Sequence, residues 1–262
     1  MFAASAAEAL YAGDPEACHE LSQAAAERYL AAGSLRHACV HKSNAAFACI
    51  ESGALVEAEA VLRELLPLAL RLGTPNIVAS AQHNLGYVLA QRGALDEAVA
   101  LEREAIAALE RQGDRRLLGS AEVYLAVALA AQGELAGAAA AATRGIAALE
   151  VVPPLRGHAL AVLAEITLRA GDAVAARAVA EQAVAVLVEL GGALEEGESL
   201  VRLVDALTLE AVGRPDEARA AVRVARRRVE ERAEKIRGAW RQSFLLVKEN
   251  ARTLELARRW GV

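Results

Sequence analysis

Aromatic residues and prolines are scarce in this sequence of 262 residues, which has two tryptophans, four tyrosines, three phenylalanines and six prolines. β-Sandwiches and barrels depend on aromatic and β-branched strands, so this scarcity argues against an all-β fold. Alanine, the strongest helix former, accounts for 64 residues. The apolar content of 55% excludes an intrinsically disordered chain. The composition therefore predicts an all-α protein whose helices pack through small side chains.

Long apolar runs and paired cysteines are also missing. No run of about 18 residues is free of charged side chains, so we expect no transmembrane helix. The N-terminus has no basic stretch before its alanines and carries Glu8, unlike a secretory signal peptide. Cys18, Cys39 and Cys49 form no CxxC pair. Cys39 and Cys49 would lie about 15 Å apart on one helix, too far for a disulfide. Free thiols are typical of a reducing compartment, so we expect a cytoplasmic protein.

Basic residues gather only near the C-terminus, where residues 214–262 hold 14 basic and 7 acidic residues in a chain of net charge −5. That net charge predicts no general attraction to nucleic acid or to an anionic membrane. A phosphate-binding stripe is one interpretation of the basic cluster. Interleaved glutamates and a core-facing apolar spacing favour a solvated helix face instead. The cluster comprises Arg219, Arg223, Arg226, Arg227, Arg228, Arg232, Lys235 and Arg237.

A repeat runs through the chain, marked by glycines 38 to 42 residues apart at Gly13, Gly53, Gly93, Gly133, Gly171 and Gly213. Seven residues before each glycine stands a small residue: Ala6, Ala46, Gly86, Ala126, Ala164 and Ala206. Five residues after each stands another: Cys18, Ala58, Ala98, Ala138, Ala176 and Ala218. These registers predict helical hairpins in which the glycine supplies the positive-φ turn. One hairpin cannot bury its own apolar face, so neighbouring hairpins must stack.

Residues 84–109, NLGYVLAQRGALDEAVALEREAIAAL, resemble a tetratricopeptide repeat, with Leu85-Gly86, Gly93, Glu97-Ala98 and Ala105 at signature positions. The units are longer than the usual length of about 34 residues. In this they resemble the long-helix repeats found in bacterial signalling proteins. The resemblance implies an all-α fold: a right-handed α-solenoid of antiparallel helix pairs that binds peptides or proteins on its concave face. We expect a solenoid of about six hairpins over residues 1–237 and capping helices over residues 238–262, about 12 to 14 helices in all.

The C-terminal end carries a second resemblance. Residues 213–228 (GRPDEARAAVRVARRR) and 241–262 (RQSFLLVKENARTLELARRWGV) are similar to the end of tandem-repeat regions in large bacterial multidomain serine/threonine kinases and ATPase-type regulators. Lys248 replaces a proline of that pattern. The resemblance implies a regulatory arm whose effector domain, such as a kinase, lies outside this chain. Trp240, Phe244 and Trp260 are expected to cover the last hydrophobic face.

The first helix of each unit lines the concave face in this family. The side of that helix that faces into the concavity is therefore the candidate peptide-binding groove. An asparagine amide can both donate to and accept from a peptide backbone. In related arrays an asparagine at the matching position binds peptide, and the resemblance implies this role for Asn44 and Asn84. The alternative is that both are solvated on an open helix face. The candidates are Ser43, Asn44, Phe47, Glu51, Ser80, His83, Asn84, Tyr87, Gln91, Ser120, Tyr124, His158, Glu165 and Arg169.

Motifs of catalysis are absent: the sequence has no GK[ST] phosphate loop, no GxSxG and no kinase HRD or DFG. His37 and His41 have a zinc-ligand spacing but no third ligand, so we expect no metal or cofactor. The sequence therefore predicts a non-catalytic protein- or peptide-binding scaffold in bacterial signalling. The alternatives are a sensor domain that changes shape around a short peptide or small molecule, and a self-assembling structural module.

Overall fold

A computed structural model describes residues 6, 8–9, 14–194 and 196–262. The described residues form helices and turns and contain no strand, which confirms the all-α prediction. The helices with defined bounds are α2 (Pro15–Ala31), α3 (Leu35–Glu51), α4 (Leu55–Arg71), α5 (Pro75–Arg92), α6 (Leu95–Gln112), α7 (Arg115–Gln132), α8 (Leu135–Ala148), α9 (Pro153–Arg169), α10 (Ala173–Glu189), α11 (Glu198–Ala211), α12 (Pro215–Lys235), α13 (Gly238–Leu246) and α14 (Lys248–Trp260).

Glycines in the left-handed region end many of these helices. Gly93 ends α5 with φ of 87° and Gly133 ends α7 with φ of 88°. The other turn glycines of the predicted repeat, Gly53, Gly171 and Gly213, follow α3, α9 and α11 and also have positive φ. Gly13 lies outside the described residues. The links between hairpins use the same device at Gly33, Gly73 and Gly113. The turns within and between hairpins are therefore alike.

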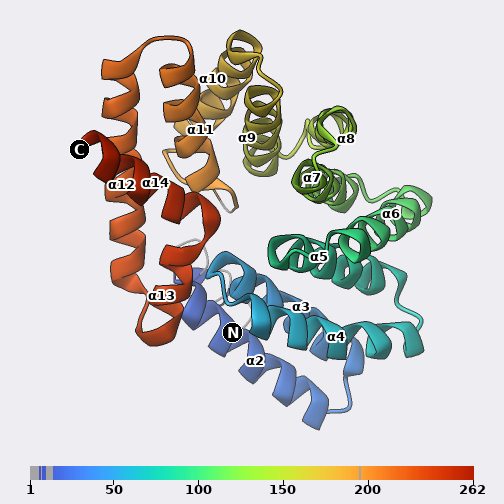
Figure 1. The fold of residues 1–262 in the computed structure, drawn as a ribbon. Coiled ribbons are helices and arrows are strands. Elements are labelled where there is room, and N and C mark those ends of the chain that lie inside the picture. The colour runs from blue at the N-terminus through green and yellow to red at the C-terminus, as the bar shows by residue number, and fades with distance from the viewer. Residues whose placement is uncertain (1–5, 7, 10–13, 195) are drawn as a thin grey trace.

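The helices form two concentric layers (Figure 1). Helices α3, α5, α7, α9 and α11 lie on the inside, and each packs against the next inner helix. Helices α4, α6, α8, α10 and α12 lie on the outside as their antiparallel partners. We call the side of the inner helices that faces the centre the inner face. The predicted α-solenoid of helix pairs is thereby confirmed.

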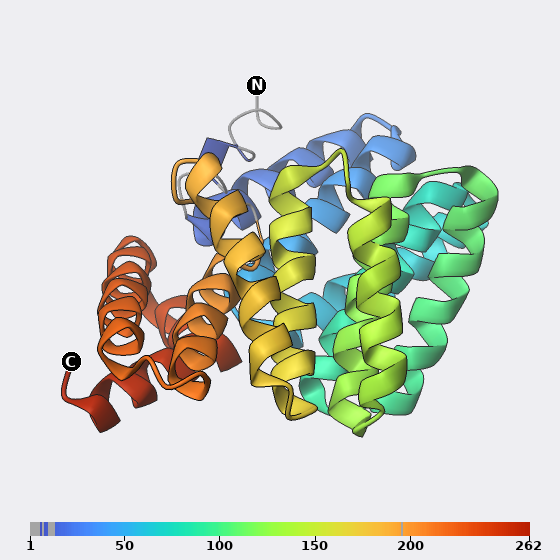
Figure 2. The ribbon, with the colours of Figure 1, turned by 90° about the horizontal axis from the view of Figure 1, so that it is seen from above.

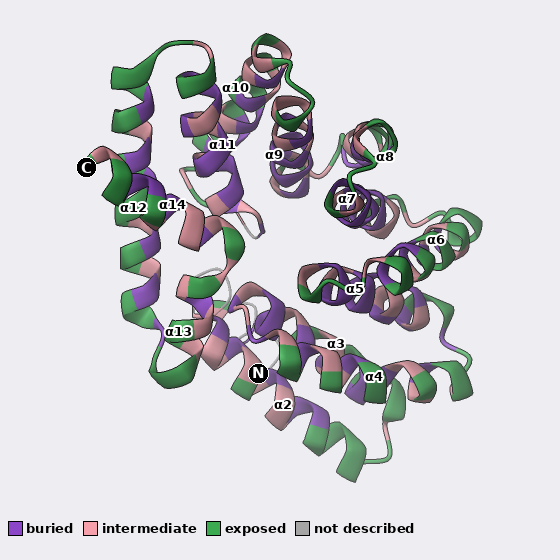
Figure 3. Ribbon diagram, viewed as in Figure 1, coloured by how far each residue is buried: buried purple, intermediate pink, exposed green. Residues whose placement is uncertain are grey.

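Small residues allow the two layers to approach closely. The residues seven before the turn glycines are buried in every described hairpin, and those five after are also buried. Gly145 shows why size matters, because a Cβ there would lie 2.8 Å from Val123 Cγ2. The inner helices are buried on several sides, whereas the outer helices are exposed along one side (Figure 3). The small-residue registers thus mark the contacts between helices.

The C-terminal helices α13 and α14 close the curved solenoid into a ring (Figures 1 and 2). The Trp240 ring lies 5.0 Å from the His19 ring of α2, and the Arg237 N–H donates to Glu16 at 3.1 Å. A Cβ at Gly53 would lie only 2.7 Å from the Ser243 carbonyl oxygen. Trp240 therefore packs against α2 and does not only cover the last hydrophobic face of the solenoid. Trp260, by contrast, packs against the cluster of α11, α12 and α14.

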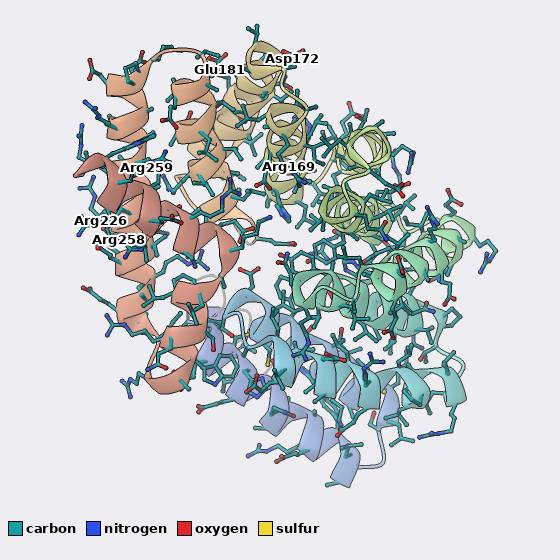
Figure 4. The ribbon with its side chains drawn as sticks, viewed as in Figure 1. Arg169, Asp172, Glu181, Arg226, Arg258 and Arg259 are labelled. Carbon is teal, nitrogen blue, oxygen red and sulfur yellow. The ribbon has the colours of Figure 1, made fainter. Side chains whose placement is uncertain are left out.

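The basic cluster of α12 is only partly a solvated face, and this corrects the expectation from sequence. Arg228 donates to Glu198 at 2.8 Å, and Arg232 lies 3.8 Å from Glu51. Both side chains thus pair with carboxylates at the inside of the ring. Arg226 stays outside beside α14, near Arg258 and Arg259 (Figure 4). Within the described residues, no helix is both long enough and apolar enough to cross a membrane.

Candidate functional site

Aromatic and histidine side chains stack along the inner face between α5 and α7. The ring centroids of His83 and Tyr124 are 4.6 Å apart, and those of Tyr87 and Tyr124 are 4.1 Å apart. His83 and Tyr87 lie one helical turn apart on α5, which places both against the same tyrosine of α7. Tyr124 itself is only 1% exposed. The three rings form a continuous stack across two neighbouring inner helices.

The segment between α10 and α11 folds back into the ring and contacts this stack. Glu196 accepts a hydrogen bond from the Tyr124 hydroxyl at 2.7 Å, and its carboxylate lies 3.1 Å from His158 Nδ1 of α9. Gly197 has φ of 76°, and a Cβ there would lie 2.4 Å from His158 Cδ2. Only glycine fits this close approach. A carboxylate of the chain itself therefore occupies the middle of the inner face.

The electrostatic environment sets the protonation of these groups. Burial lowers the pKa of His158, but the adjacent Glu196 carboxylate, together with the charges of Glu51 and Glu249, raises it, so the net pKa lies above its ordinary value. Burial raises the pKa of Glu196, but His158 and the Tyr124 hydroxyl hold it below the ordinary value overall. Burial lowers the pKa of His83 to about 4, which keeps that ring neutral within the stack. The arrangement therefore favours a charged His158–Glu196 pair beside neutral aromatic rings.

Four of the predicted groove residues meet around Glu196. Tyr124 and His158 contact its carboxylate, and His83 and Tyr87 stack on the Tyr124 ring. The other predicted groove residues differ in how far they are exposed. The equivalent asparagines differ, because Asn44 is exposed whereas Asn84 is only 5% exposed. An open helix face therefore does not describe the surroundings of Asn84.

Other predicted groove residues join neighbouring helices. The Ser43 and Ser80 hydroxyls lie 3.4 Å apart between α3 and α5. Arg169 donates to the Ala130 carbonyl of α7 at 2.7 Å (Figure 4). Glu165 pairs with Arg252 of α14. Ser120 is buried, whereas Phe47, Glu51 and Gln91 are half-buried.

Sequence reasoning missed the residues that the ring closure brings inside. A small cavity of about 60 Å³ lies at the centre of the ring, between the inner face and helices α12 to α14. Its lining includes Glu196, Glu198, Arg232, Glu249 and Asn250, none of which was a predicted groove residue. The glycines around residues 191–197 signal an irregular segment but not where it folds.

Histidine and cysteine side chains build no metal centre in the part of the chain that the structure describes. His37 and His41 both stack on the Tyr29 ring, with centroids 5.0 and 5.3 Å away. Cys18, Cys39 and Cys49 are buried and free. Burial raises the pKa of the Cys49 thiol to about 12, so it is a poor nucleophile.

Comparison with known proteins identifies the fold. No model of a known protein family and no curated protein sequence matches the chain. Solved structures do match. A Rap protein in complex with Competence and Sporulation Factor has a TM-score of 0.72 and 9% identity, over 97% of this chain and 72% of that one. NprR in complex with its cognate peptide NprX has a TM-score of 0.69 and 11% identity, over 98% of this chain and 71% of that one.

A third similar structure is a Signal Transduction ATPase with Numerous Domains from Pyrococcus horikoshii that has a tetratricopeptide repeat sensor. Its TM-score is 0.63 at 13% identity, over 94% of this chain but only 37% of that one. Identities this low establish the fold and not the activity. Together with the paired helices and their small-residue registers, these likenesses show that the chain folds as a tetratricopeptide-type α-solenoid.

Proposed function

We propose that this chain is a non-catalytic peptide-binding module whose inner face holds an extended peptide. The observation that carries the proposal is the insertion of Glu196 between Tyr124 and His158, because a side chain from outside the inner helices already binds to the inner face. Backbone and side-chain groups of a foreign peptide would meet the same hydroxyl, imidazole and aromatic surfaces. NprR, which shares the fold, was solved with a bound peptide.

The spacing of the helices suggests the length of such a peptide. Neighbouring inner helices pack directly against each other, so equivalent inner-face positions one hairpin apart are separated by about 10 Å. An extended chain covers two such steps with about six residues, at about 3.3 Å each. A hexapeptide would therefore reach across three inner helices, from the α3 face near Asn44, past Tyr87 of α5, to α7.

A second candidate function is a sensor that changes shape on binding, and the ring closure favours it. Glu196 occupies the inner face and the start of α13 contacts α2, so an incoming peptide must displace Glu196 or open the ring. Small-angle scattering with and without peptide separates the two functions. A scaffold keeps its radius of gyration, whereas a sensor changes it.

We also propose that the chain acts in the bacterial cytoplasm as the recognition arm of a longer signalling protein with an effector domain such as a kinase. The tetratricopeptide repeat sensor of the Pyrococcus ATPase offers a precedent for that arrangement. The reading frame of the native gene tests this proposal. A frame that encodes no domain besides this solenoid would contradict it.

The peptide proposal is tested by affinity selection from a random hexapeptide library, followed by calorimetry on the selected peptides. Tyr87→Ala should weaken binding by about 1–3 kcal/mol, because the stacked ring is lost from the inner face. Tyr29→Ala is the matched control, since Tyr29 lies on α2 and stacks on other histidines. Equal affinity for both variants would place binding on the outer face or at the ends.

Asn84→Ala tests the role that the tetratricopeptide resemblance implies for the asparagines. If Asn84 pairs with the peptide backbone, affinity should fall by about 1–3 kcal/mol. Because Asn84 is buried, thermal unfolding of the free variant must be measured alongside. Asn44→Ala, at the exposed equivalent position, is the companion variant. Unchanged peptide affinity in a folded double variant would exclude the asparagine clamp.

A further inference from the structure

The cavity at the centre of the ring is lined by four carboxylates. Glu51 comes from the end of α3, Glu196 from the segment before α11, Glu198 from the first residue of α11, and Glu249 from α14. The basic side chains among its lining residues are Arg232 and His158. Arg232 lies 3.8 Å from Glu51 and His158 lies 3.1 Å from Glu196, so these two basic groups balance two of the four carboxylates.

Two of these carboxylates are well paired within the protein. Glu198 accepts from Arg202 at 2.9 Å and from Arg228 at 2.8 Å. Glu196 is held by Tyr124 and His158 through one carboxylate oxygen. Glu249 differs, because its half-buried carboxylate makes no hydrogen bond or ion pair with any described residue. It leaves both oxygens available on the α14 side of the cavity.

Asn250 adds an independent sign of a missing donor. Its side chain lines the same cavity and is only 1% exposed. Its Nδ2 donates to the Phe244 carbonyl at 2.8 Å, whereas its Oδ1 has no partner. A buried acceptor without a donor is destabilising, and each such group in a native structure calls for a partner. The partner that fits Asn250 Oδ1 and Glu249 is a group rich in N–H donors.

The chemistry of the lining narrows the class of ligand. No cluster of three His, Cys, Asp or Glu side chains within the described residues could hold a metal ion. Ammonium and guanidinium groups instead direct several N–H donors to acceptors at hydrogen-bond distance. The volume of about 60 Å³ suits one such head group rather than a whole ligand.

We propose that this cavity binds the ammonium or guanidinium group of a ligand, through the Glu249 carboxylate and Asn250 Oδ1. The inference rests on the proposed peptide-binding function, since a peptide on the inner face would insert its amino terminus or a lysine or arginine side chain here. The Glu249 carboxylate and the Asn250 acceptor would disfavour a carboxylate at the same position of the peptide.

The test uses small cations as probes, on the full chain, with the Asn250 side-chain amide followed by NMR. Methylammonium and methylguanidinium chloride should each shift that signal in a saturable manner. Tetramethylammonium chloride at the same ionic strength has the charge but no N–H donor, and it should not. Comparing the two active probes distinguishes an amine from a guanidinium as the preferred group. Equal shifts with all three salts would overturn the proposal.

Matched variants of α14 test the role of the carboxylate. Glu249→Gln should weaken methylammonium or methylguanidinium binding about tenfold, as expected for loss of one charge-assisted hydrogen bond. Glu255→Gln, an exposed glutamate on the same helix, should leave binding unchanged. An unaltered affinity in Glu249→Gln would overturn the site.

The hexapeptide selection separates this inference from the function on which it rests. Selected peptides that carry lysine, arginine or a required free amino terminus would support the cavity. Peptides that bind at the inner face, lose affinity in Tyr87→Ala and carry no cationic group would overturn the cavity while the peptide-binding function stands. Binding of the small cations with no peptide selected would support the cavity and contradict the peptide-binding function.

Discussion

Glu102 is a carboxyl group buried completely between α5 and α6, and neither of its oxygens has a hydrogen-bond partner in the described structure. Burial raises its pKa well above the ordinary value, so the folded protein holds it as the neutral acid. Gly86 makes room for it, because a Cβ there would lie 2.6 Å from Glu102 Oε1. The corresponding pair one hairpin earlier is Ala46 with Leu62, both fully buried. An apolar pair thus fits the same slot.

The double variant Gly86→Ala/Glu102→Leu should therefore stabilise the protein. It copies the Ala46/Leu62 pair and removes an unpaired buried acid, with an expected gain of about 1–3 kcal/mol in the free energy of unfolding. Urea unfolding provides the measurement. Glu110→Leu, at an exposed position of α6, is the control and should change stability little. Destabilisation of the double variant would mean that an unseen partner satisfies Glu102.

The buried acid also predicts a pH dependence. Above its ordinary pKa of 4.5, the unfolded chain releases the Glu102 proton while the folded protein keeps it. The unfolded state is then favoured progressively, by up to about 1.4 kcal/mol per pH unit. The stability advantage of Gly86→Ala/Glu102→Leu over the wild type should hence grow between about pH 5 and pH 7. An advantage that is the same at both pH values would show that Glu102 ionises normally.

The irregular element between α10 and α11 reaches the inner face through one ion pair, and His158 reports on it. Burial lowers the pKa of His158, whereas the Glu196 carboxylate, together with the charges of Glu51 and Glu249, raises it above its ordinary value of 6.5. Glu196→Gln should therefore lower the pKa of His158, followed by NMR. His83, with a pKa of about 4, is an internal reference in the same spectra. A His158 pKa that does not fall in the variant would mean that a carboxylate other than Glu196 raises it.

Raising the pKa of His158 in the fold also has a consequence for stability. The pair with Glu196 contributes below the ordinary pKa of histidine, and this contribution is lost as the pH rises through the higher folded value. At the acid end, the depressed pKa of Glu196 keeps the pair intact until its carboxylate is protonated. The pair thus contributes most between the ordinary pKa values of 4.5 and 6.5, at mildly acidic pH.

Helices of the solenoid contact each other through small-residue slots, and Ala98 of α6 is one that is fully buried. Ala98→Leu should destabilise by about 1–3 kcal/mol, since added methyl groups overpack the contact. Ala100→Leu is a matched control on the same helix, because Ala100 is exposed. Thermal unfolding distinguishes the two variants. Equal melting temperatures would mean that the slot tolerates size and that the register does not govern packing.

At the scale of the whole molecule, the closure of the ring depends on a close approach at Gly53. Its φ is 73°, and a Cβ would lie 2.7 Å from the Ser243 carbonyl and 2.8 Å from Val247 Cγ2. Gly93 has a similar φ of 87° but no atom within 4 Å of its Cβ position. The two glycines thus share the backbone strain of substitution but only one faces α13.

Gly53→Ala should separate α13–α14 from the N-terminal helices, whereas Gly93→Ala should only add the strain of a left-handed alanine, about 1–2 kcal/mol. Small-angle scattering should show a larger radius of gyration for Gly53→Ala alone. The paired design isolates the steric clash from the backbone effect. Equal radii for both variants would mean that the ring stays closed without this contact.

The sequence by itself determined the helical hairpins of this protein. The turn glycines at Gly93 and Gly133, the buried slots at Ala98 and Ala126 and the helix lengths all follow from patterns within one repeat. Such features depend on local backbone geometry and on contacts between adjacent helices, which a periodic sequence specifies directly. The aromatic candidates Tyr87 and Tyr124 of the inner face follow from the same periodicity.

Tertiary structure alone decided what fills and closes the centre. The contact between Glu16 and Arg237 joins residues 221 positions apart, and the insertion of Glu196 beside Tyr124 spans 72 positions. Small rotations at each hairpin add up to the curvature that brings the ends together, and no single repeat records that sum. The inward pairing of Arg232 and the unpartnered Asn250 Oδ1 both follow from the closed ring, which is why the periodic pattern did not reveal them.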